Sequence, residues 1–481
     1  MRIRSQGTNQ ALPKREITSD WFTEAVRDCG DVMIHDLHLG DEGSEKQANY
    51  RIWYCEGTVD YLMMQQLLGG GQGFGDGGLS IDPEKSPFIS SLDPGSEGKA
   101  LFNSLFSGQI VIWNRETGLF FAMDCSSLPS RSIEESTLEL SIKGPRDGFV
   151  EEIETNMALI RKRLRSPKLH VEWYTIGSES LTRIGLLSMK GIVSESVLEE
   201  ARSRIKSIEI AVLHGAGELE EIISDKSLAL VPLIDYVGRA DFVVQSLMNG
   251  RFAILVNGSP AALIAPVNVS LLVKSPEDAY QPFYFVAFER TLRLFSFLFA
   301  GLLPGFWLGL LAFNNDQIPF ALLATVTMSR IGLPLSPQME MFIMMLMFEI
   351  FREAGVRLPR AVGQTVTVVG GLIVGDAAIR AGLTSPAMLV ITAVTAVSTF
   401  TLVNQSLNGS VTVFRVFIML AAAFLGLFGF FLSTFGVLLY LCTLESFGMP
   451  FMKPLAPFEF KKTLTAVWQL PWRYRVKRRV R

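Results

Sequence analysis

The chain has 481 residues, too many for one ordinary domain, and its charge is nearly balanced, with 44 basic and 47 acidic residues. The net charge of −3 argues neither for nor against nucleic acid. A mean hydropathy of +0.31 with 49% hydrophobic residues is high for a soluble protein, although 19% of the residues are charged.

The charges are unevenly distributed along the chain. The first 290 residues have the mixed composition of a soluble domain. No charge occurs between Leu294 and Asn315, and Arg415 is the one charged residue between Ala381 and Leu444. Runs of this length can cross a bilayer core about 30 Å thick. We therefore predict an α/β (α+β) N-terminal region followed by an α-helical multi-pass membrane domain.

The first residues and the cysteines indicate the compartment. Residues 1–21 lack the apolar stretch of a signal peptide, so we expect the soluble region to stay in the cytoplasm. Cys29, Cys55 and Cys125 are an odd number in the soluble half, and Cys442 is far away. This pattern favours reduced thiols over a disulfide framework.

Alternating apolar residues and turn signals predict a series of strands and helices in the soluble half. The order is typical of an α/β or α+β region. The expected elements are a strand at 49–60, a helix at 60–68, a hairpin at 108–125, strands at 168–177 and 182–193, a helix at 194–210 and a hairpin at 251–267 with an Asn257-Gly258 turn.

A helix is also predicted within residues 144–167, ending at Pro167. Acidic residues lie at its start and basic ones at its end, an order that suits the helix dipole. The basic end could bind phosphate, but a solvated helix end is the favoured interpretation. One apolar face is expected to comprise Phe149, Ile153, Met157, Ile160 and Leu164.

No chemistry-bearing pattern stands out in the soluble half. His35 and His38 lie near Asp31, Asp36 and Asp41, but aspartate-rich stretches of this kind are usually solvated turns, so we predict no metal site. The glycines at 69–78 are not preceded by a strand and followed by a helix, as a nucleotide loop requires. Without a nucleophile constellation, we predict no enzyme activity and no cofactor.

The membrane half begins with Arg290 and Arg293, which stand before a predicted span at 294–313. Residues 318–329 are too short to span and predict a half-span or interfacial helix, followed by Pro334 and Pro337.

A helix at 339–354 carries Glu340 and Glu349 on opposite faces. Helical spacing predicts the ion pairs Glu349–Arg352 and Glu353–Arg357. Glu340 has no basic residue three or four positions away, so we expect it to be freer to meet a cation.

Further predicted spans follow at 386–407 and within 411–444, the latter as two short ones meeting near Gly426 and Gly429. Eight basic and no acidic residues follow Glu459, which marks the cytoplasmic side and predicts an even number of crossings, four or six. A stripe of small residues that would let another helix come close comprises Gly363, Thr367, Gly371 and Gly375.

These patterns divide the chain into five expected parts. They are a partly flexible N-terminal segment at 1–48, a soluble subdomain at 49–143, a second soluble subdomain with a membrane-proximal hairpin at 144–288, a helical transmembrane domain at 289–450 and a basic cytoplasmic tail at 451–481.

Five ordered blocks resemble the A subunits of GerA-type spore germinant receptors. They are "IKGPRDGFVEEIETNMALIRKRLR", "NGRFAILVNGSPAALIAP", "SPEDAY", "FEIFREAGVRLPRAVGQ" and "SFGMPFMKPLAPF". The resemblance extends from about Tyr50 to Phe458. The family usually has an acidic residue where Asn257 stands.

The resemblance implies an A subunit of a nutrient receptor in the spore inner membrane, multi-pass, with both termini cytoplasmic. It implies partnership with a transporter-like B subunit and a C lipoprotein, and a homo-oligomeric, germinant-gated cation channel that starts germination. No nucleic-acid partner is expected. An A-like paralogue acting as an accessory ion channel and a secondary transporter remain as alternatives.

Two groups of candidate site residues follow. The ion-path or gating candidates are Glu340, Glu349, Arg352, Glu353, Arg357 and Asp376. The soluble-domain motif comprises Gly144, Pro145, Arg146, Gly148, Phe149, Asn156, Arg161 and Arg163.

Overall fold

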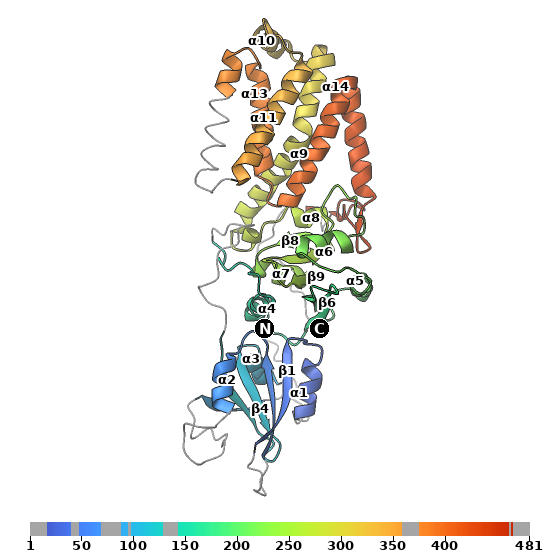
Figure 1. Ribbon diagram of the computed structural model, residues 1–481. Coiled ribbons are helices and arrows are strands. Elements are labelled where there is room, and N and C mark those ends of the chain that lie inside the picture. The colour runs from blue at the N-terminus through green and yellow to red at the C-terminus, as the bar shows by residue number, and fades with distance from the viewer. Residues whose placement is uncertain are drawn as a thin grey trace, which may run out of the picture. The chain divides into compact units, whose positions relative to one another are not determined.

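The computed structural model describes residues 17–39, 48–68, 88–94, 98–127, 143–357, 375–460 and 463–464 (Figure 1). Contacts divide the chain into two units. The α/β unit contains residues 145–223, 236–265 and the described residues before 128. The helical unit contains residues 224–235 and the chain from Pro266 onward. Each unit is described separately below.

The α/β unit contains two five-stranded sheets, the first with strand order β1-β2-β4-β5-β3. Every described pair in this first sheet is antiparallel, as short chain connections favour. The predicted strand and the predicted hairpin of this region are confirmed. The strands are β1 (Val32–Leu39), β2 (Ala48–Cys55), β3 (Ile89–Leu92), β4 (Gln109–Asn114) and β5 (Phe120–Asp124).

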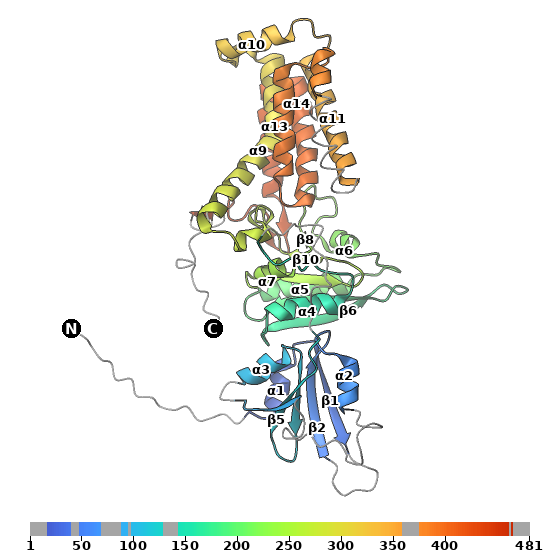
Figure 2. The ribbon, with the colours of Figure 1, turned by 90° about the vertical axis from the view of Figure 1, so that its left-hand side faces the viewer.

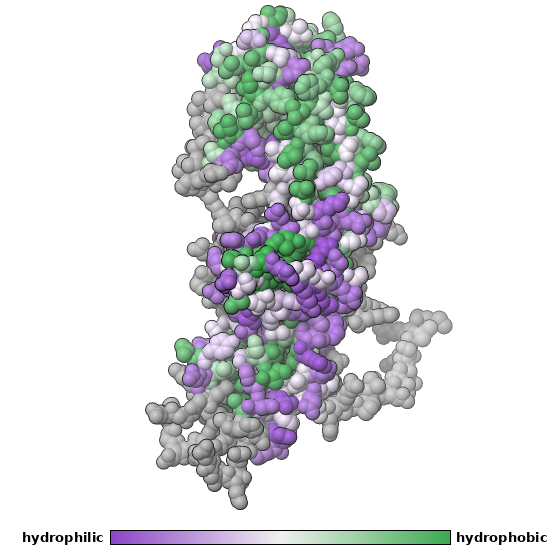
Figure 3. Space-filling view, turned by 45° about the vertical axis from the view of Figure 1, so that its right-hand side comes forward, coloured by the Kyte–Doolittle hydropathy of each residue, from purple (hydrophilic) through white to green (hydrophobic). Residues whose placement is uncertain are grey.

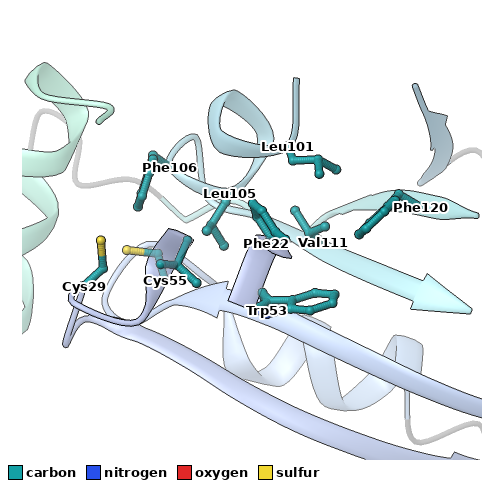
Figure 4. Close-up of a cluster of buried hydrophobic side chains, with 10 residues drawn as sticks. Phe22, Cys29, Trp53, Cys55, Leu101, Leu105, Phe106, Val111 and Phe120 are labelled. Atoms are coloured by element: carbon teal, nitrogen blue, oxygen red, sulfur yellow. The ribbon is translucent and has the colours of Figure 1, made fainter. Parts of the chain in front are cut away.

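Side-chain alternation along β2 gives the first sheet two apolar faces. Trp53 and Cys55 point toward α1 (Ser19–Val26) and α3 (Lys99–Leu105), where they pack with Phe22 (Figure 4). On the other face, Tyr50, Ile52 and Tyr54 pack in a cluster that includes residues of α2 (Tyr61–Leu68). We expected 1–48 to be a partly flexible segment, but α1 and β1 belong to this folded core; residues 1–16 lie outside the described residues.

The second sheet has the order β6-β7-β9-β10-β8 and includes the predicted strand pair and hairpin. Every residue of β9 and β10 is buried. The β9–β10 loop is longer than the predicted two-residue turn, because Val256 and Ala262 enclose five residues, of which Gly258 has φ +83°. The strands are β6 (Leu169–Ile176), β7 (Thr182–Met189), β8 (Asp235–Val237), β9 (Phe252–Val256) and β10 (Ala262–Ala265).

Four helices accompany the second sheet. α4 (Ile153–Arg163) and α7 (Ala240–Leu247) contact each other and β9. α5 (Glu195–Lys206) begins after Ser194, as predicted, and contacts α6 (Ala216–Ile223), which in turn contacts β10.

α4 is shorter than the predicted helix, and Phe149 lies before it. The side chain of Asn156 holds Val150 by accepting from its N–H at 2.8 Å and donating to its carbonyl at 2.5 Å. The backbone N–H of Phe149 donates to the carbonyl of Gly238 at 2.9 Å. These bonds keep the segment before Ile153 extended, so Phe149 is buried outside the helix.

The described part of the helical unit comprises six helices, of which α8 is a single short turn, and several shorter elements. Figure 2 shows the longer helices of this unit side by side. The helices are α8 (Val269–Leu272), α9 (Phe283–Phe313), α10 (Phe320–Arg330), α11 (Pro337–Arg357), α13 (Pro386–Phe400) and α14 (Gln405–Cys442). Short 3₁₀ turns lie at Pro276–Ala279 and Asn315–Gln317, and β11 (Glu445–Ser446) pairs with β12 (Met449–Pro450).

α14 is two helices joined by a sharp reversal at Gly426, which has φ +62° and ψ −146°. The rings of Phe414 and Tyr440 lie 6.1 Å apart. In one straight helix these residues would be about 39 Å apart. The two halves therefore form an antiparallel hairpin, and the prediction of two short segments meeting near Gly426 agrees with this geometry.

The start of α9 and the end of α14 lie at the same end of the helical unit. The N–H of Val267 donates to the Ser446 hydroxyl at 3.0 Å, and the N–H of Val269 donates to the Phe451 carbonyl at 2.9 Å. Both bonds join the chain just before α9 to the chain just after α14. The polypeptide between these two segments therefore returns to the end of the helical unit at which it began.

The helical unit has the surface of a membrane protein. α9 and the α14 hairpin are long and apolar enough to span a membrane, and α10 and α13 are shorter apolar helices. Hydrophobic side chains dominate the visible face of this unit (Figure 3). Many of its large apolar side chains are exposed, among them Phe288 and Phe295 of α9 and Phe424 and Phe428 of α14.

Candidate functional site

One buried charge in the helical unit is Glu340, at the start of α11. Only 1% of its side chain is exposed. Arg330, at the end of α10, donates to one carboxylate oxygen at 2.5 Å. The other oxygen accepts from Thr384 at 3.0 Å and from the N–H and hydroxyl of Ser385 at 2.6 and 2.7 Å. The expectation that Glu340 is free of a basic partner is wrong, because the turn after α10 brings back an arginine ten positions upstream.

A second charge cluster, which we call the inner cluster, consists of Glu349, Arg352 and Arg415; Arg415 is buried, whereas the side chains of Glu349 and Arg352 are 32% and 21% exposed. One Glu349 oxygen accepts from Arg352, as helical spacing predicted. The other accepts from Arg415 at 3.3 Å, across to the first half of α14. Arg352 also donates to Asn408 at 3.1 Å. Two arginines therefore share one carboxylate inside an apolar helical unit.

Arg415 joins four helices at one point. Its guanidinium donates to the Ala300 carbonyl of α9 at 3.4 Å, to the Thr399 hydroxyl of α13 at 3.1 Å and to Thr412 of its own helix at 3.3 Å. Only 3% of its side chain is exposed. Its Nε atom is buried without a hydrogen-bond partner among the described residues. Buried polar groups of this kind are rare, so the site calls for an explanation.

A third cluster lies where α9 begins. Asp278 accepts from Arg290 at 2.7 Å and from Arg293 at 2.8 Å, and it closes a capping box with Ser275. Arg293 also pairs with Glu289 at 3.1 Å. The two arginines predicted to stand before the first span thus anchor the start of α9 to the preceding turn.

The other candidates of the helical unit are placed as follows. Asp376 pairs with Arg380 at 2.7 Å, with both side chains largely exposed. Glu353 is exposed on α11, and the side chain of Arg357 lies outside the described part, so the pair predicted between them is untested. A Cβ on Gly375 would lie 3.2 Å from Leu389 of α13. The remaining members of the predicted small-residue stripe, Gly363, Thr367 and Gly371, fall outside the described residues.

Two glycines of α9 lie close to the first half of α14. A Cβ on Gly305 of α9 would lie 2.8 Å from Ile418, and one on Gly309 would lie 3.1 Å from the backbone at Gly426. Small residues at such positions let helix backbones meet closely. α9 therefore packs against the first half of α14 through glycines that the sequence analysis did not single out.

Several residues of the soluble-domain motif make structural contacts within the chain. Arg163 pairs with Asp147 through two contacts of 2.6 Å. Gly148 forms a backbone bridge with Arg239, beside the Phe149–Gly238 bond. Gly144 and Pro145 precede this extended segment, and Arg146 is exposed.

Arg161 is fully buried, although the sequence analysis favoured a solvated helix end for the basic cluster to which it belongs. It donates to Asp31 through Nε at 2.5 Å and through a terminal nitrogen at 2.6 Å, and the Phe106 ring lies 4.2 Å from its guanidinium carbon. Burial disfavours its charge, but the Asp31 carboxylate outweighs this and raises the pKa of Arg161. Arg161 thereby joins α4 to the first sheet, which excludes it from a phosphate site.

Two of the three aspartates weighed as metal ligands make other contacts, and Asp41 lies outside the described residues. Asp31 binds Arg161 and accepts from the Cys55 thiol at 3.1 Å, and Asp36 accepts from Arg51 at 2.7 Å. Cys29, Cys55, Cys125 and Cys442 are free thiols, as predicted. Burial raises the pKa of the Cys125 thiol to about 11, so at neutral pH it is protonated.

Sequence reasoning missed Arg415, Arg330 and Ser385 as members of charged sites. A signal existed for Arg415, the one charged residue between Ala381 and Leu444. Ionisable residues inside membrane segments are expensive and usually functional. For Arg330 and Ser385 the signal was absent, because their contacts with Glu340 depend on how the turns fold back.

An α/β unit followed by apolar helices with ion pairs among them defines a membrane protein with a large polar domain. The chain belongs to the family of Bacillus/Clostridium GerA spore germination proteins, whose sequence pattern matches residues 20–480. The resemblance drawn from the five sequence blocks is thereby confirmed.

Relatives match most of the chain. Spore germination protein XA of Bacillus anthracis is 39% identical over 426 residues, covering 87% of this chain and 86% of that protein. Spore germination protein KA of Bacillus subtilis is 37% identical over 487 residues, covering 97% and 85%. The uncharacterized membrane protein YfkQ of Bacillus subtilis is 35% identical over 385 residues, covering 80% and 75%.

One solved structure is also similar. It is the crystal structure of the N-terminal domain of the A subunit of the Bacillus megaterium spore germinant receptor GerK3, with 26% sequence identity and a TM-score of 0.37, covering 51% of this chain and 92% of that chain.

Proposed function

We propose that this protein is an A subunit of a nutrient germinant receptor that oligomerises into a germinant-gated cation channel and starts spore germination. The observation that carries the proposal is the inner cluster, where Glu349, Arg352 and Arg415 meet among apolar helices. Ionisable residues within apolar membrane segments are rare and usually mark ion pathways or switches. Family membership supplies the biological setting.

We propose the partners and the location on the basis of family membership. The chain acts with a transporter-like B subunit and a C lipoprotein in the spore inner membrane, and several copies of the chain assemble around the ion path. Both termini are cytoplasmic. The shared end of α9 and the α14 hairpin supports this topology, since it requires an even number of crossings between them.

Glu349 is the acid that we place beside the ion path. Glu340 is less suited, because all its partners are supplied by Arg330, Thr384 and Ser385. Acids repeated by oligomer symmetry favour cations. Arg352, Glu353, Arg357 and Asp376 remain gating candidates around it.

Two alternatives have support of their own. The similarity to YfkQ, described as an uncharacterized membrane protein, is compatible with an accessory ion channel that has no nutrient of its own. The break of α14 at Gly426 resembles the discontinuous helices of secondary transporters.

The test uses spores that lack this chain. Deletion should abolish cation release in response to at least one germinant and leave responses through other receptors intact. Unchanged release with every germinant would refute a receptor role. Ion flux measured in liposomes that contain the purified complex, with and without a gradient of candidate solutes, separates a channel from a transporter.

A further inference from the structure

We propose that Arg415 keeps the ion path closed by covering the Glu349 carboxylate with surplus positive charge, and that its separation from Glu349 is the step that admits cations. This inference rests on the proposed channel function and names the residue that regulates it.

The first step of the argument is the saturation of Glu349. One carboxylate oxygen is taken by Arg352 and the other by Arg415 at 3.3 Å. A cation that reached this point would have to compete with two guanidinium groups for the same oxygens. In the observed conformation, Glu349 is therefore a poor cation ligand.

The second step is the count of charges. Arg352 and Arg415 bring two positive charges to one negative charge, and Arg415 is 3% exposed. Glu349 and Arg352 are 32% and 21% exposed, so the weakly screened positive charge is that of the buried Arg415, which repels other cations. The inner cluster is thus a barrier to cations as long as Arg415 stays in it.

The third step is that Arg415 is redundant for pairing Glu349. Arg352 already neutralises this acid from the next turn of α11. The Nε of Arg415 has no hydrogen-bond partner in the part of the chain that the structure describes, so these residues do not satisfy this side chain fully. A purely structural ion pair would need only one arginine and would leave no donor unsatisfied. An arginine that separates from Glu349 explains both the second arginine and the unsatisfied donor.

The fourth step is position. Arg415 contacts Ala300 of α9 and Thr399 of α13, and Glu349 belongs to α11. A small shift of the α14 hairpin against these three helices is enough to break a 3.3 Å contact. A partner subunit that prefers the shifted arrangement would thereby open the path.

The experiment compares variants of the full receptor in spores. Arg415→Gln leaves Glu349 paired with Arg352, so we expect it to accumulate normally. It should raise cation release from dormant spores before any germinant is added by at least about tenfold, which corresponds to about 1.4 kcal/mol between closed and open states. Arg415→Lys keeps the charge and should stay near the wild-type rate. Lys226→Gln is the matched control, because it removes one positive charge from an exposed position of the same unit, away from the gating candidates.

A double variant tests the role of Glu349. Adding Glu349→Gln to Arg415→Gln should return the basal release to the wild-type level, because the exposed carboxylate that favours cations is gone. Basal release by Arg415→Gln equal to that of Lys226→Gln, a leak of equal size in Arg415→Lys, or loss of the Arg415→Gln protein would each overturn the inference.

The outcome is separable from that of the proposed function. If deletion of the chain abolishes a germinant response but Arg415→Gln does not leak, the channel proposal stands and the role of Arg415 falls. If deletion changes no response, the proposed function falls first.

Discussion

Arg161 and Arg163 lie two positions apart on α4 and have different environments. Arg161 follows Met157 by four positions, so it lies on the buried face, and Arg163 projects from another side toward Asp147. The helical period therefore predicts that a residue at position 161 points inward. The sequence cannot predict its partner, because Asp31 lies 130 positions away.

Arg161→Met should destabilise the α/β unit by about 3–5 kcal/mol, because it leaves the Asp31 carboxylate buried without a counter-charge. Chemical unfolding of the purified full chain in detergent, followed by tryptophan fluorescence, measures this. Lys162→Met, a change at the exposed neighbouring position, should have an effect below about 0.5 kcal/mol. Equal effects of the two substitutions would show that the buried pair adds nothing.

A second residue-scale prediction concerns acid. Lys190 donates to Asp28 at 2.5 Å, and this hydrogen bond, opposed by burial and aided by His170, lowers the pKa of Asp28 below its ordinary value of 3.8. The stabilisation is present above the unfolded pKa and is lost as pH falls through the lower folded pKa.

Lys190→Met should therefore cost about 0.2–1 kcal/mol at pH 7, since both side chains are substantially exposed, and less at about pH 2.5, below the ordinary pKa of the carboxyl group. Thermal unfolding of the full chain at the two pH values measures the difference. Lys206→Met, at another exposed lysine, should show no such pH dependence. A cost that stays the same at both pH values argues against the Asp28 pair.

At the scale of elements, the α14 hairpin shows which structural features can be predicted from the hydropathy pattern. The length of the apolar run and its glycines predicted two segments meeting near Gly426. The pattern did not predict how tightly they pair, which depends on contacts such as that between Phe414 and Tyr440.

Gly426→Ala should disrupt the hairpin. A side chain at φ +62° and ψ −146° costs about 1–3 kcal/mol of backbone strain, and the new Cβ would lie 2.8 Å from that of Phe313. Cysteines placed at Phe414 and Tyr440 in a Cys442→Ser background report the closed hairpin through cross-linking yield. Gly436→Ala, in open space on the second half, should leave the yield unchanged. An unchanged yield in Gly426→Ala means that another residue sets the reversal.

The strands and most helices of the α/β unit were predictable because period-two and helical patterns are local properties. The start of α4 was not, since Asn156 and Gly238 hold Phe149 in an extended segment. The candidate site was predictable only where partners lie within one helix. Glu349–Arg352 follows from spacing, whereas the contact of Glu349 with Arg415 spans 66 positions. Its existence depends on the packing of four helices.

At the scale of the whole molecule, topology gives the last prediction. Reporters fused before Met1 and after Arg481 should both report the cytoplasm, because the chain leaves the helical unit at the end where it came in. A reporter inserted in the turn Asn315–Gln317, at the far end of α9, should report the opposite side. The same side for the turn and the two termini would mean that α9 does not cross.

The pairing of α9 with α14 also has a consequence for biosynthesis. α9 leaves the ribosome roughly a hundred residues before the helix that fills its glycine groove, since Gly305 and Gly309 meet Ile418 and Gly426. Until the hairpin arrives, the nascent chain presents an unfilled helix face to lipid or to the insertion machinery. Chains that terminate before Gln405 would lack α14, which packs against the glycines of α9, and would lack Arg415, which pairs with Glu349. A truncated product therefore leaves the glycine-containing face of α9 uncovered within the membrane. Proteolytic quality control can remove such a product before it joins an oligomer.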